Sequence, residues 1–260
     1  PARIRAVAEA NGADISGLRL VATEHSHASA AAAVALARGG EVEMLMKGSL
    51  HTDEILGFIV ASQSGLRTER RVSHVFVMDV PAYDRLLLVT DAAINIEPTL
   101  AEKADIVRNA IDLAHVLGVS MPKVAILSAV ETVNPNIRST LDAAALCKMA
   151  DRGQIQGGIL DGPLAFDNAI SEHAARTKSS RSPVAGRADI LMVPNIDSGN
   201  MLAKQLQYFA GADSAGVVLG ARVPVVLTSR ADNVRMRIGS TAVAKLMAHA
   251  RRAAGWKGPR

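Results

Sequence analysis

The middle of the chain contains, in order, KVAILSA at residues 123–129, TLDAAALCKMA at 140–150 and IQGGIL at 155–160. The first and third are short apolar runs typical of buried strands, whereas the second is rich in Ala and Leu and is typical of a helix. Gly153 lies just after the helical run and is expected to end it. A strand, a helix and a second strand in this order predict a parallel pair with a helical crossover.

The same alternation of apolar runs and helical stretches continues on both sides of this segment. Residues 73–80 and 85–91 flank the turn-forming residues 81–84, which predicts a hairpin and therefore one antiparallel strand. We expect an α/β fold with a mainly parallel sheet that helices cover on both faces. Further strands are expected at 18–23, 42–46, 189–193, 216–219 and 225–228.

The composition limits the class of protein. The 260 residues are 49% hydrophobic but only 3% aromatic, so aliphatic side chains fill the expected core. The net charge of +4 favours anionic substrates, whereas scattered basic residues and scarce aromatics do not predict nucleic-acid binding. No apolar run reaches the roughly 20 residues of a membrane span. A single cysteine, Cys147, excludes an intrachain disulfide and indicates a cytoplasmic setting.

Polar side chains follow four of the strands, and ligands of such sheets bind at the carboxyl ends of strands. Lys47 and Gly48 end one strand and suit an anion, although a surface lysine in a turn is the simpler interpretation. Pro163 is expected at the start of a helix, where its missing N–H costs nothing. Asp161, two residues earlier, is either the cap of that helix or a substrate ligand.

A third polar loop runs from Pro194 to Asn200. It places Asn195 and Asn200 between an apolar strand and a helix, and Lys204 follows Asn200 by four residues on the same helix face. The loop therefore offers several hydrogen bonds to a polar substrate. The simpler interpretation makes Ser198 the N-cap of the helix.

The fourth polar loop, residues 228–233, combines groups that complement one another. Arg230 can hold a phosphate with two contacts, Ser229 can donate to a developing oxyanion, and Asp232 can accept a proton. Asp232 could instead pair with Arg230 or Arg235. The combination of the three groups at a strand end favours a functional loop.

Several other catalytic and binding motifs are missing from the sequence. There is no glycine-rich dinucleotide loop after the first strand, no Walker phosphate loop and no serine nucleophile elbow. His25 and His27 lie two residues apart without a further Cys or His at metal-binding spacing, so no metal site is predicted. Cys147 lies in a helical run of Ala and Leu and is interpreted as a buried structural thiol.

Short motifs at these loops run in one order along almost the whole chain. They are Met46-Lys47-Gly48, Ser73-His74-Val75, Leu88-Val89-Thr90-Asp91-Ala92-Ala93, Asn95-Ile96, Asp161-Gly162-Pro163-Leu164-Ala165, Pro194-Asn195-Ile196, Gly199-Asn200 and Leu227-Thr228-Ser229-Arg230-Ala231-Asp232. Together they resemble the phosphate acetyltransferase and phosphate butyryltransferase family. The butyryl-type members are most similar, and the resemblance extends to the version of this domain fused behind an enoyl-CoA hydratase domain.

The resemblance implies two α/β domains with mainly parallel sheets and an interdomain cleft, as in isocitrate and isopropylmalate dehydrogenases. The first domain would contain residues 1–120 and 215–260, and the second residues 121–214. Family members carry an extra strand and helix ahead of Pro1, in line with the helical stretch at 2–11 that opens this chain. The resemblance also implies a homodimer.

The resemblance further places Ser229 and Arg230 in the cleft, but the chain departs from the family in two ways. Gln207 and Tyr208 stand near the position where acetyl-type members often have an arginine. The catalytic aspartate of the family lies a few residues beyond the Ser-Arg pair, whereas Asp232 here is closer. The identity of the general base is therefore open.

We predict reversible transfer of a short acyl group, acetyl or butyryl, between coenzyme A (CoA) and inorganic phosphate. CoA is a substrate, and no cofactor or metal is expected. The alternatives are a non-catalytic CoA-binding domain of a larger fused protein and a metal- and NAD(P)-dependent dehydrogenase, for which the aspartate cluster is missing. The predicted catalytic residues are Ser229, Arg230 and Asp232, and the predicted substrate-binding residues are Lys47, Asp161, Asn195, Asn200 and Lys204.

Overall fold

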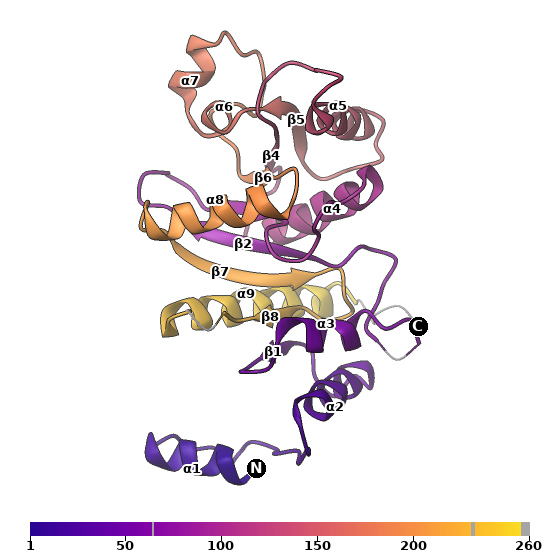
Figure 1. The fold of residues 1–260 in the computed structure, drawn as a ribbon, viewed down its shortest axis with the longest axis vertical. Helices are drawn as coiled ribbons and strands as arrows, with labels where there is room; N and C mark the ends of the chain where they lie inside the picture. The colour runs from indigo at the N-terminus through magenta and orange to yellow at the C-terminus, as the bar shows by residue number, and fades with distance from the viewer. Residues whose placement is uncertain (64, 230–231, 256–260) are drawn as a thin grey trace.

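The computed structural model describes residues 1–63, 65–229 and 232–255. In this part of the chain eight strands form one mixed sheet in the order β1-β8-β7-β2-β3-β6-β4-β5 (Figure 1). The strands are β1 Leu45–Lys47, β2 Ser73–Asp79, β3 Leu87–Thr90, β4 Lys123–Leu127, β5 Ile159–Leu164, β6 Ile190–Met192, β7 Asp213–Leu219 and β8 Val225–Leu227.

The sheet contains two parallel groups that run in opposite directions. Strand β1 pairs in parallel with β8, and β3, β6, β4 and β5 form the second parallel group. Strand β2 pairs antiparallel with both β3 and β7, and β7 pairs antiparallel with β8. The expected hairpin is confirmed, and β7 adds a reversal that was not predicted. The carboxyl ends of β1 and β8 therefore lie at one edge of the sheet, and those of β3, β6, β4 and β5 at the other.

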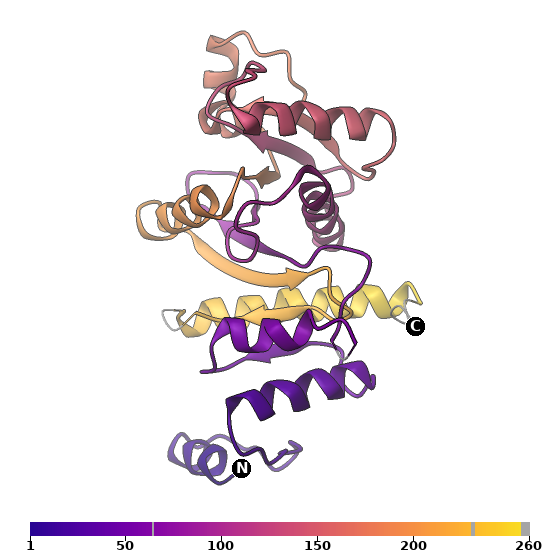
Figure 2. The same ribbon diagram turned by 45° about the vertical axis from the view of Figure 1, so that its right-hand side comes forward.

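Helices cover both faces of this sheet, as the two ribbon views show (Figures 1 and 2). Helices α4 and α9 contact strands β2 and β7 respectively, while α8 contacts β3. The helices are α1 Ala2–Ala10, α2 Ser26–Arg38, α3 Thr52–Ile59, α4 Leu100–Val116, α5 Arg138–Asp151, α6 Phe166–Ile170, α7 Glu172–Thr177, α8 Ile196–Tyr208 and α9 Val234–Ala253.

Strand β2 separates two parts of the core because successive side chains point to opposite faces of a sheet. Val75 and Val77 belong to the cluster that includes Val107 of α4 and Val243 of α9. Phe76 packs instead against the cluster that includes Ala203 of α8. The α8 face of β2 is the face on which the candidate site lies.

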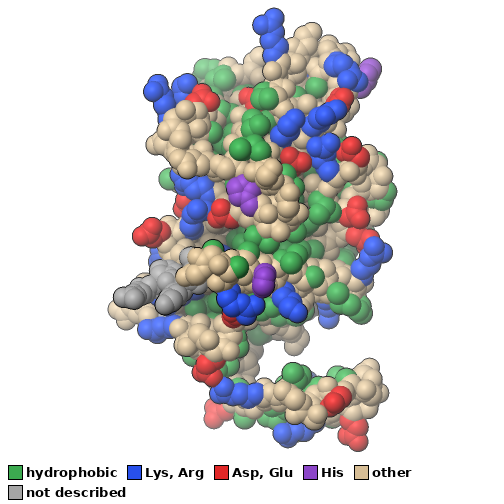
Figure 3. Space-filling view, turned by 180° about the vertical axis from the view of Figure 1, so that it is seen from behind, with side chains coloured by type: hydrophobic (Ala, Val, Ile, Leu, Met, Phe, Trp, Pro, Cys, Tyr) green, Lys and Arg blue, Asp and Glu red, His purple; other side chains and the backbone are tan. Residues whose placement is uncertain are grey.

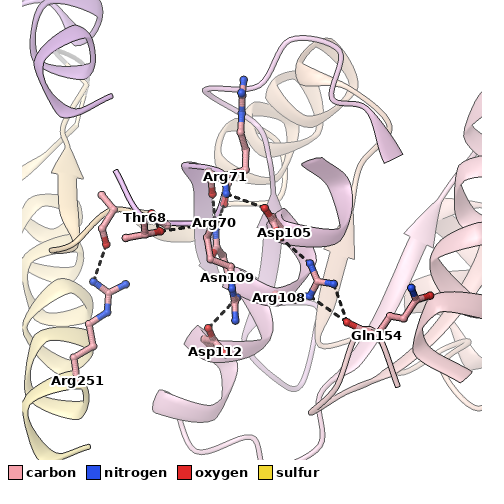
Figure 4. A network of polar contacts seen from close by, with 12 residues as sticks. Thr68, Arg70, Arg71, Asp105, Arg108, Asn109, Asp112, Gln154 and Arg251 are labelled. Atoms are coloured by element: carbon pink, nitrogen blue, oxygen red, sulfur yellow. Dashed lines mark hydrogen bonds and ion pairs between the residues drawn. The ribbon is translucent and has the colours of Figure 1, made fainter. Parts of the chain in front are cut away.

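A polar network fixes the start of β2 on helix α4 (Figure 4). The amide of Asn109 donates to the carbonyl oxygen of Arg71 over 2.8 Å and to the hydroxyl of Ser73 over 2.9 Å. The carboxylate of Asp105 accepts from the backbone N–H of Arg71 at 3.0 Å and from the guanidinium of Arg108 at 2.7 Å. The first residues of β2 are thereby held against α4 on the side of the sheet away from α8.

In the part of the chain that the structure describes, one sheet runs across the expected boundary between the two domains. Strand β3 lies in the segment assigned to the first domain, and β6 lies in the segment assigned to the second. Yet Leu88, Val89 and Thr90 pair in parallel with Ile190, Leu191 and Met192. This pairing carries one sheet through the predicted boundary.

Two local predictions also need correction. Residues 18–23 form no strand, and irregular backbone fills this stretch between α1 and α2. Pro163 lies within β5 rather than at the start of a helix, and α6 begins at Phe166. Strand β5 is an edge strand, where a residue without a backbone N–H is tolerated.

The surface is marked by a projecting N-terminal helix and by mixed positive and negative charges. Helix α1 projects from one end of the molecule, and a hollow separates it from the rest in the space-filling view (Figure 3). On the face drawn there, Lys and Arg side chains are interspersed with Asp and Glu. Among the described residues, no helix has both the length and the apolar character needed to cross a bilayer.

Candidate active site

A cavity of about 740 Å³ lies over β2 and β7, between helix α8 and the segments that follow β1 and β8. Its walls include five of the predicted site residues, which come from three separate parts of the chain. These residues are Lys47, Asn200, Lys204, Ser229 and Asp232. The fold therefore brings most of the predicted site residues to one cavity. Helix α8 follows β6, whose carboxyl end lies at the opposite edge of the sheet from the carboxyl ends of β1 and β8.

The parallel pairing of β1 with β8 brings the first and the fourth polar loops together. Lys47 lies beside Leu227 in the register of the two strands. The hydroxyl of Thr228 then donates to the carbonyl oxygen of Lys47 over 2.8 Å. Lys47 is only 6% exposed, and its ammonium donates to the carbonyl oxygen of Gly48 over 3.4 Å. The burial of this ammonium at the cavity wall favours the interpretation of Lys47 as a ligand of an anionic substrate over that of a surface lysine in a turn.

The loop after β8 is braced by its own aspartate. The carboxylate of Asp232 accepts a hydrogen bond from the backbone N–H of Ser229 at 2.7 Å. Arg235 pairs with Asp213 at 2.9 Å, so among the described residues it does not pair with Asp232. Arg230 lies outside the described residues. The hydroxyl of Ser229 and the carboxylate of Asp232 thus stand on one short turn at the cavity.

Helix α8 forms the opposite wall of the cavity, and its close packing against the sheet depends on Gly199. A Cβ atom on Gly199 would stand 2.7 Å from Val193 and 2.9 Å from the carbonyl oxygen of Asp91, so only glycine lets the helix pack this closely. The amide of the next residue, Asn200, donates to the carbonyl oxygen of Ala92 over 3.2 Å. Lys204 lies one turn further along α8 and is exposed.

Two predicted residues lie away from this cavity. Asn195 is the N-cap of α8, with its side chain accepting from the N–H of Ser198 at 3.1 Å and donating to Glu97 at 2.9 Å. The interpretation of Ser198 as the N-cap is therefore wrong. Asp161 lies within β5, and its carboxylate accepts from the N–H of Gly162 at 2.9 Å. Both side chains have structural partners, and neither lines the cavity.

The cysteine is a structural thiol, as its sequence context indicates. Cys147 lies on α5 and directs its Sγ towards the carbonyl oxygen of Gly162 over 3.7 Å. Burial, together with the nearby charge of Asp161, raises the pKa of the Cys147 thiol to about 12. A thiol with this pKa stays protonated at neutral pH and is a poor nucleophile. Among the described residues, no group of three or more His, Cys, Asp and Glu side chains has an arrangement that would hold a metal ion.

The cavity residues that were not predicted as part of the site include a buried histidine. His74, the second residue of β2, lines the cavity and is only 2% exposed. It belongs to the motif Ser73-His74-Val75, and a histidine inside an otherwise apolar strand was the available signal. Its placement depends on β7 and α8, which the local sequence does not reveal.

Comparison with known proteins identifies the family. The chain matches, over residues 6–245, the family described as phosphate acetyl/butaryl transferase. It is 62% identical over 253 residues to a phosphate acetyltransferase of Rhizobium meliloti, which covers 97% of this chain and 80% of that protein. It is 45% identical over 237 residues to a phosphate butyryltransferase of Clostridium acetobutylicum, covering 91% of this chain and 79% of that protein.

A solved structure agrees with this assignment. The crystal structure of a branched-chain phosphotransacylase from Enterococcus faecalis V583 is similar, with a TM-score of 0.82 and 38% identity, and the match covers 91% of this chain and 85% of that chain. The resemblance drawn from the motifs is thus confirmed, and the chain belongs to the phosphate acetyl/butyryl transferase family.

Proposed function

We propose that this protein transfers a short acyl group reversibly between CoA and inorganic phosphate, in the cavity between α8 and the ends of β1 and β8. The observation that carries the proposal is the convergence of Lys47, Lys204, Ser229 and Asp232 on one cavity in a chain of this family. Relatives named as transferases give no support to a non-catalytic CoA-binding domain.

The cavity chemistry suits two anionic substrates. The ammonium groups of Lys47 and Lys204 attract phosphate and the phosphate groups of CoA, and holding both substrates in register supplies much of the rate. Arg230, which follows the described Ser229, would bind phosphate through two contacts of its guanidinium. The hydroxyl of Ser229 would donate to the carbonyl oxygen as negative charge develops there.

The reaction itself exchanges two leaving groups at one carbonyl carbon. A phosphate oxygen attacks the thioester carbon, a tetrahedral intermediate forms, and the C–S bond breaks as the thiolate leaves. The new C–O bond gives an acyl phosphate, and the proton that the attacking phosphate loses is the one that the CoA thiolate takes up. Neither a redox step nor a Lewis acid is needed to balance this exchange. We therefore propose that CoA is the only coenzyme and that it acts as a substrate.

Further features of the whole protein belong to the same proposal. We infer a homodimer, a cytoplasmic setting, and a division of the chain into residues 1–120 with 215–260 and residues 121–214. In this division, the two parts would be joined where β3 of the first part pairs with β6 of the second. Asn195 and Asp161 would then act on substrate only after a movement of these parts, since both lie away from the cavity described here.

An assay of CoA release tests the function. Purified protein is incubated with acetyl-, propionyl- or butyryl-CoA, with and without phosphate and with and without a metal chelator. Release that requires phosphate and is unaffected by chelation supports the proposal. No release from any of these substrates by folded, full-length protein would overturn it. Because the Cys147 thiol has a pKa of about 12, it will contribute little to thiol-reagent detection of CoA.

A further inference from the structure

The ring of His74 is held in the cavity wall by packing alone. It meets the ring of Phe76 edge-on, with ring centroids 4.4 Å apart and an interplanar angle of 69°. On its other side it lies against Gly216 of β7, where a Cβ atom would stand only 2.7 Å from its Nε2. Glycine at this position leaves the space that the imidazole occupies.

The polar atoms of this ring have no partners among the described residues. The Nδ1 atom is fully buried and makes no hydrogen bond, and none joins Nε2 to another described side chain or backbone group. Buried polar groups in folded proteins are nearly always hydrogen-bonded, because leaving one unpaired costs free energy. Because Nδ1 is closed off from solvent, Nε2 is the ring nitrogen that remains to meet a partner arriving with the substrate.

The surroundings determine the charge of the ring. Burial lowers the pKa of His74 from 6.5, while the negative charges of Asp91 and Asp232 oppose this shift. The cations Lys47 and Lys204 line the same cavity. The ring is thus neutral at neutral pH, which is the form that accepts a proton. The two carboxylates would stabilise the imidazolium once the proton has moved.

Asp232 is poorly placed for the same task. Its carboxylate already accepts the backbone N–H of Ser229 at 2.7 Å, so one of its oxygens is engaged in holding the turn that carries Ser229. We propose that the imidazole of His74, rather than the carboxylate of Asp232, takes the thiol proton of CoA during acyl-CoA synthesis. This inference rests on the acyl-transfer function proposed above and assigns its general base.

The proton and the bonds balance in this scheme. The S–H proton of CoA moves to His74, and the thiolate attacks the carbonyl carbon of the acyl phosphate. The C–S bond forms, the C–O bond to phosphate breaks, and the imidazolium gives its proton to the departing phosphate oxygen. The ring ends neutral, and the reverse sequence serves the opposite direction. Asp232 keeps the Ser229 turn in place throughout.

The test compares His74→Gln with a matched control, His115→Gln. Gln keeps polarity and approximate size but accepts no proton, so kcat/KM for CoA with acetyl phosphate should fall about 100-fold or more. His115 is exposed, bonds to the carbonyl oxygen of Gly157 and does not line the cavity, so its substitution should leave kcat/KM unchanged. Equal activity of His74→Gln and the native enzyme would overturn the inference while leaving acyl transfer intact.

The pH profile of the native enzyme decides the question even if His74→Gln fails to fold. Because the neutral ring is the active form, kcat/KM for CoA should fall as pH drops through the lowered pKa of His74, with a midpoint below 6.5. A fall confined to the range of about 4, ordinary for an aspartate, would assign the base to a carboxylate and overturn the inference. An inactive native enzyme would instead overturn the proposed function itself.

Discussion

The hydroxyl of Thr228 donates a hydrogen bond to the carbonyl oxygen of Lys47 over 2.8 Å, and Thr228 itself is only 7% exposed. This bond continues the parallel pairing of β1 and β8 by one residue. It ties the loop that carries Lys47 to the turn that carries Ser229 and Asp232. The relative positions of a buried cation and a hydroxyl in the cavity therefore depend on a bond outside the regular ladder.

Thr228→Val tests this connection because valine keeps the shape of threonine and removes the donor. The free energy of unfolding should fall by about 1 kcal/mol, as expected for one lost hydrogen bond in the interior. We also expect kcat/KM to fall, since the Lys47 and Ser229 loops lose their common anchor. Denaturant unfolding and steady-state kinetics measure the two effects. Unchanged kinetics in a destabilised variant would show that the bond serves folding only.

Gly199→Ala should displace α8 from the sheet. The added methyl group would stand 2.7 Å from Val193 and 2.9 Å from the carbonyl oxygen of Asp91, so overpacking should cost about 1–3 kcal/mol. Asn200 and Lys204 would move with the helix, and activity should fall as well. Gly57→Ala is the control, because Gly57 lies in α3 with nothing within 4 Å of its Cβ position. Equal stability of the two variants by thermal denaturation would contradict the packing argument.

Lys204→Ala should weaken substrate binding without affecting the fold. Lys204 is exposed at the cavity wall, and no described residue forms an ion pair with it. Losing one exposed cation near an anionic substrate should raise KM about fivefold, and less at high salt. Lys245→Ala, an exposed lysine on α9 away from the cavity, should leave KM unchanged. If both variants behave alike, net charge rather than the position of Lys204 matters.

Arg230→Ala is predicted to be the most damaging single change for phosphate use, on the basis of its place in the motif. A charge-assisted hydrogen bond contributes roughly 1.5–3 kcal/mol, so losing one implies a 10- to 100-fold lower rate. Arg230→Lys should rescue activity only in part, because an ammonium cannot match two phosphate oxygens at once. The defect should appear in kcat/KM for phosphate at an unchanged melting temperature. A lower melting temperature with an unchanged KM for phosphate would assign Arg230 to structure.

Local chemistry explains which elements could be predicted. The capping box of α4, with the N–H of Thr99 donating to Glu102 over 2.8 Å, is such a local feature, because both partners lie within one turn. The hairpin of β2 and β3 follows from the turn residues between them. By contrast, the apolar run at 18–23 has no strand beside it, and a short apolar run alone does not show whether a partner exists.

Long-range pairing explains which of the predicted site residues line the cavity and which lie away from it. Lys47 ends β1 and Ser229 follows β8, and these parallel strands bring both residues to one edge of the sheet. Asp161 belongs to the other group, whose strands run the opposite way because β2 and β7 reverse the direction. That reversal depends on contacts between distant segments. His74 was missed for the same reason, since its burial comes from β7 and α8.

The measurement that tests acyl transfer most directly is the stoichiometry of products from acetyl-CoA and phosphate. Free CoA is quantified by its thiol, and acyl phosphate by trapping with hydroxylamine, in the same reaction mixture. Transfer to phosphate predicts one acyl phosphate for each CoA released, and no CoA without phosphate. Release of CoA without acyl phosphate would identify a thioester hydrolase and contradict the function proposed for this cavity.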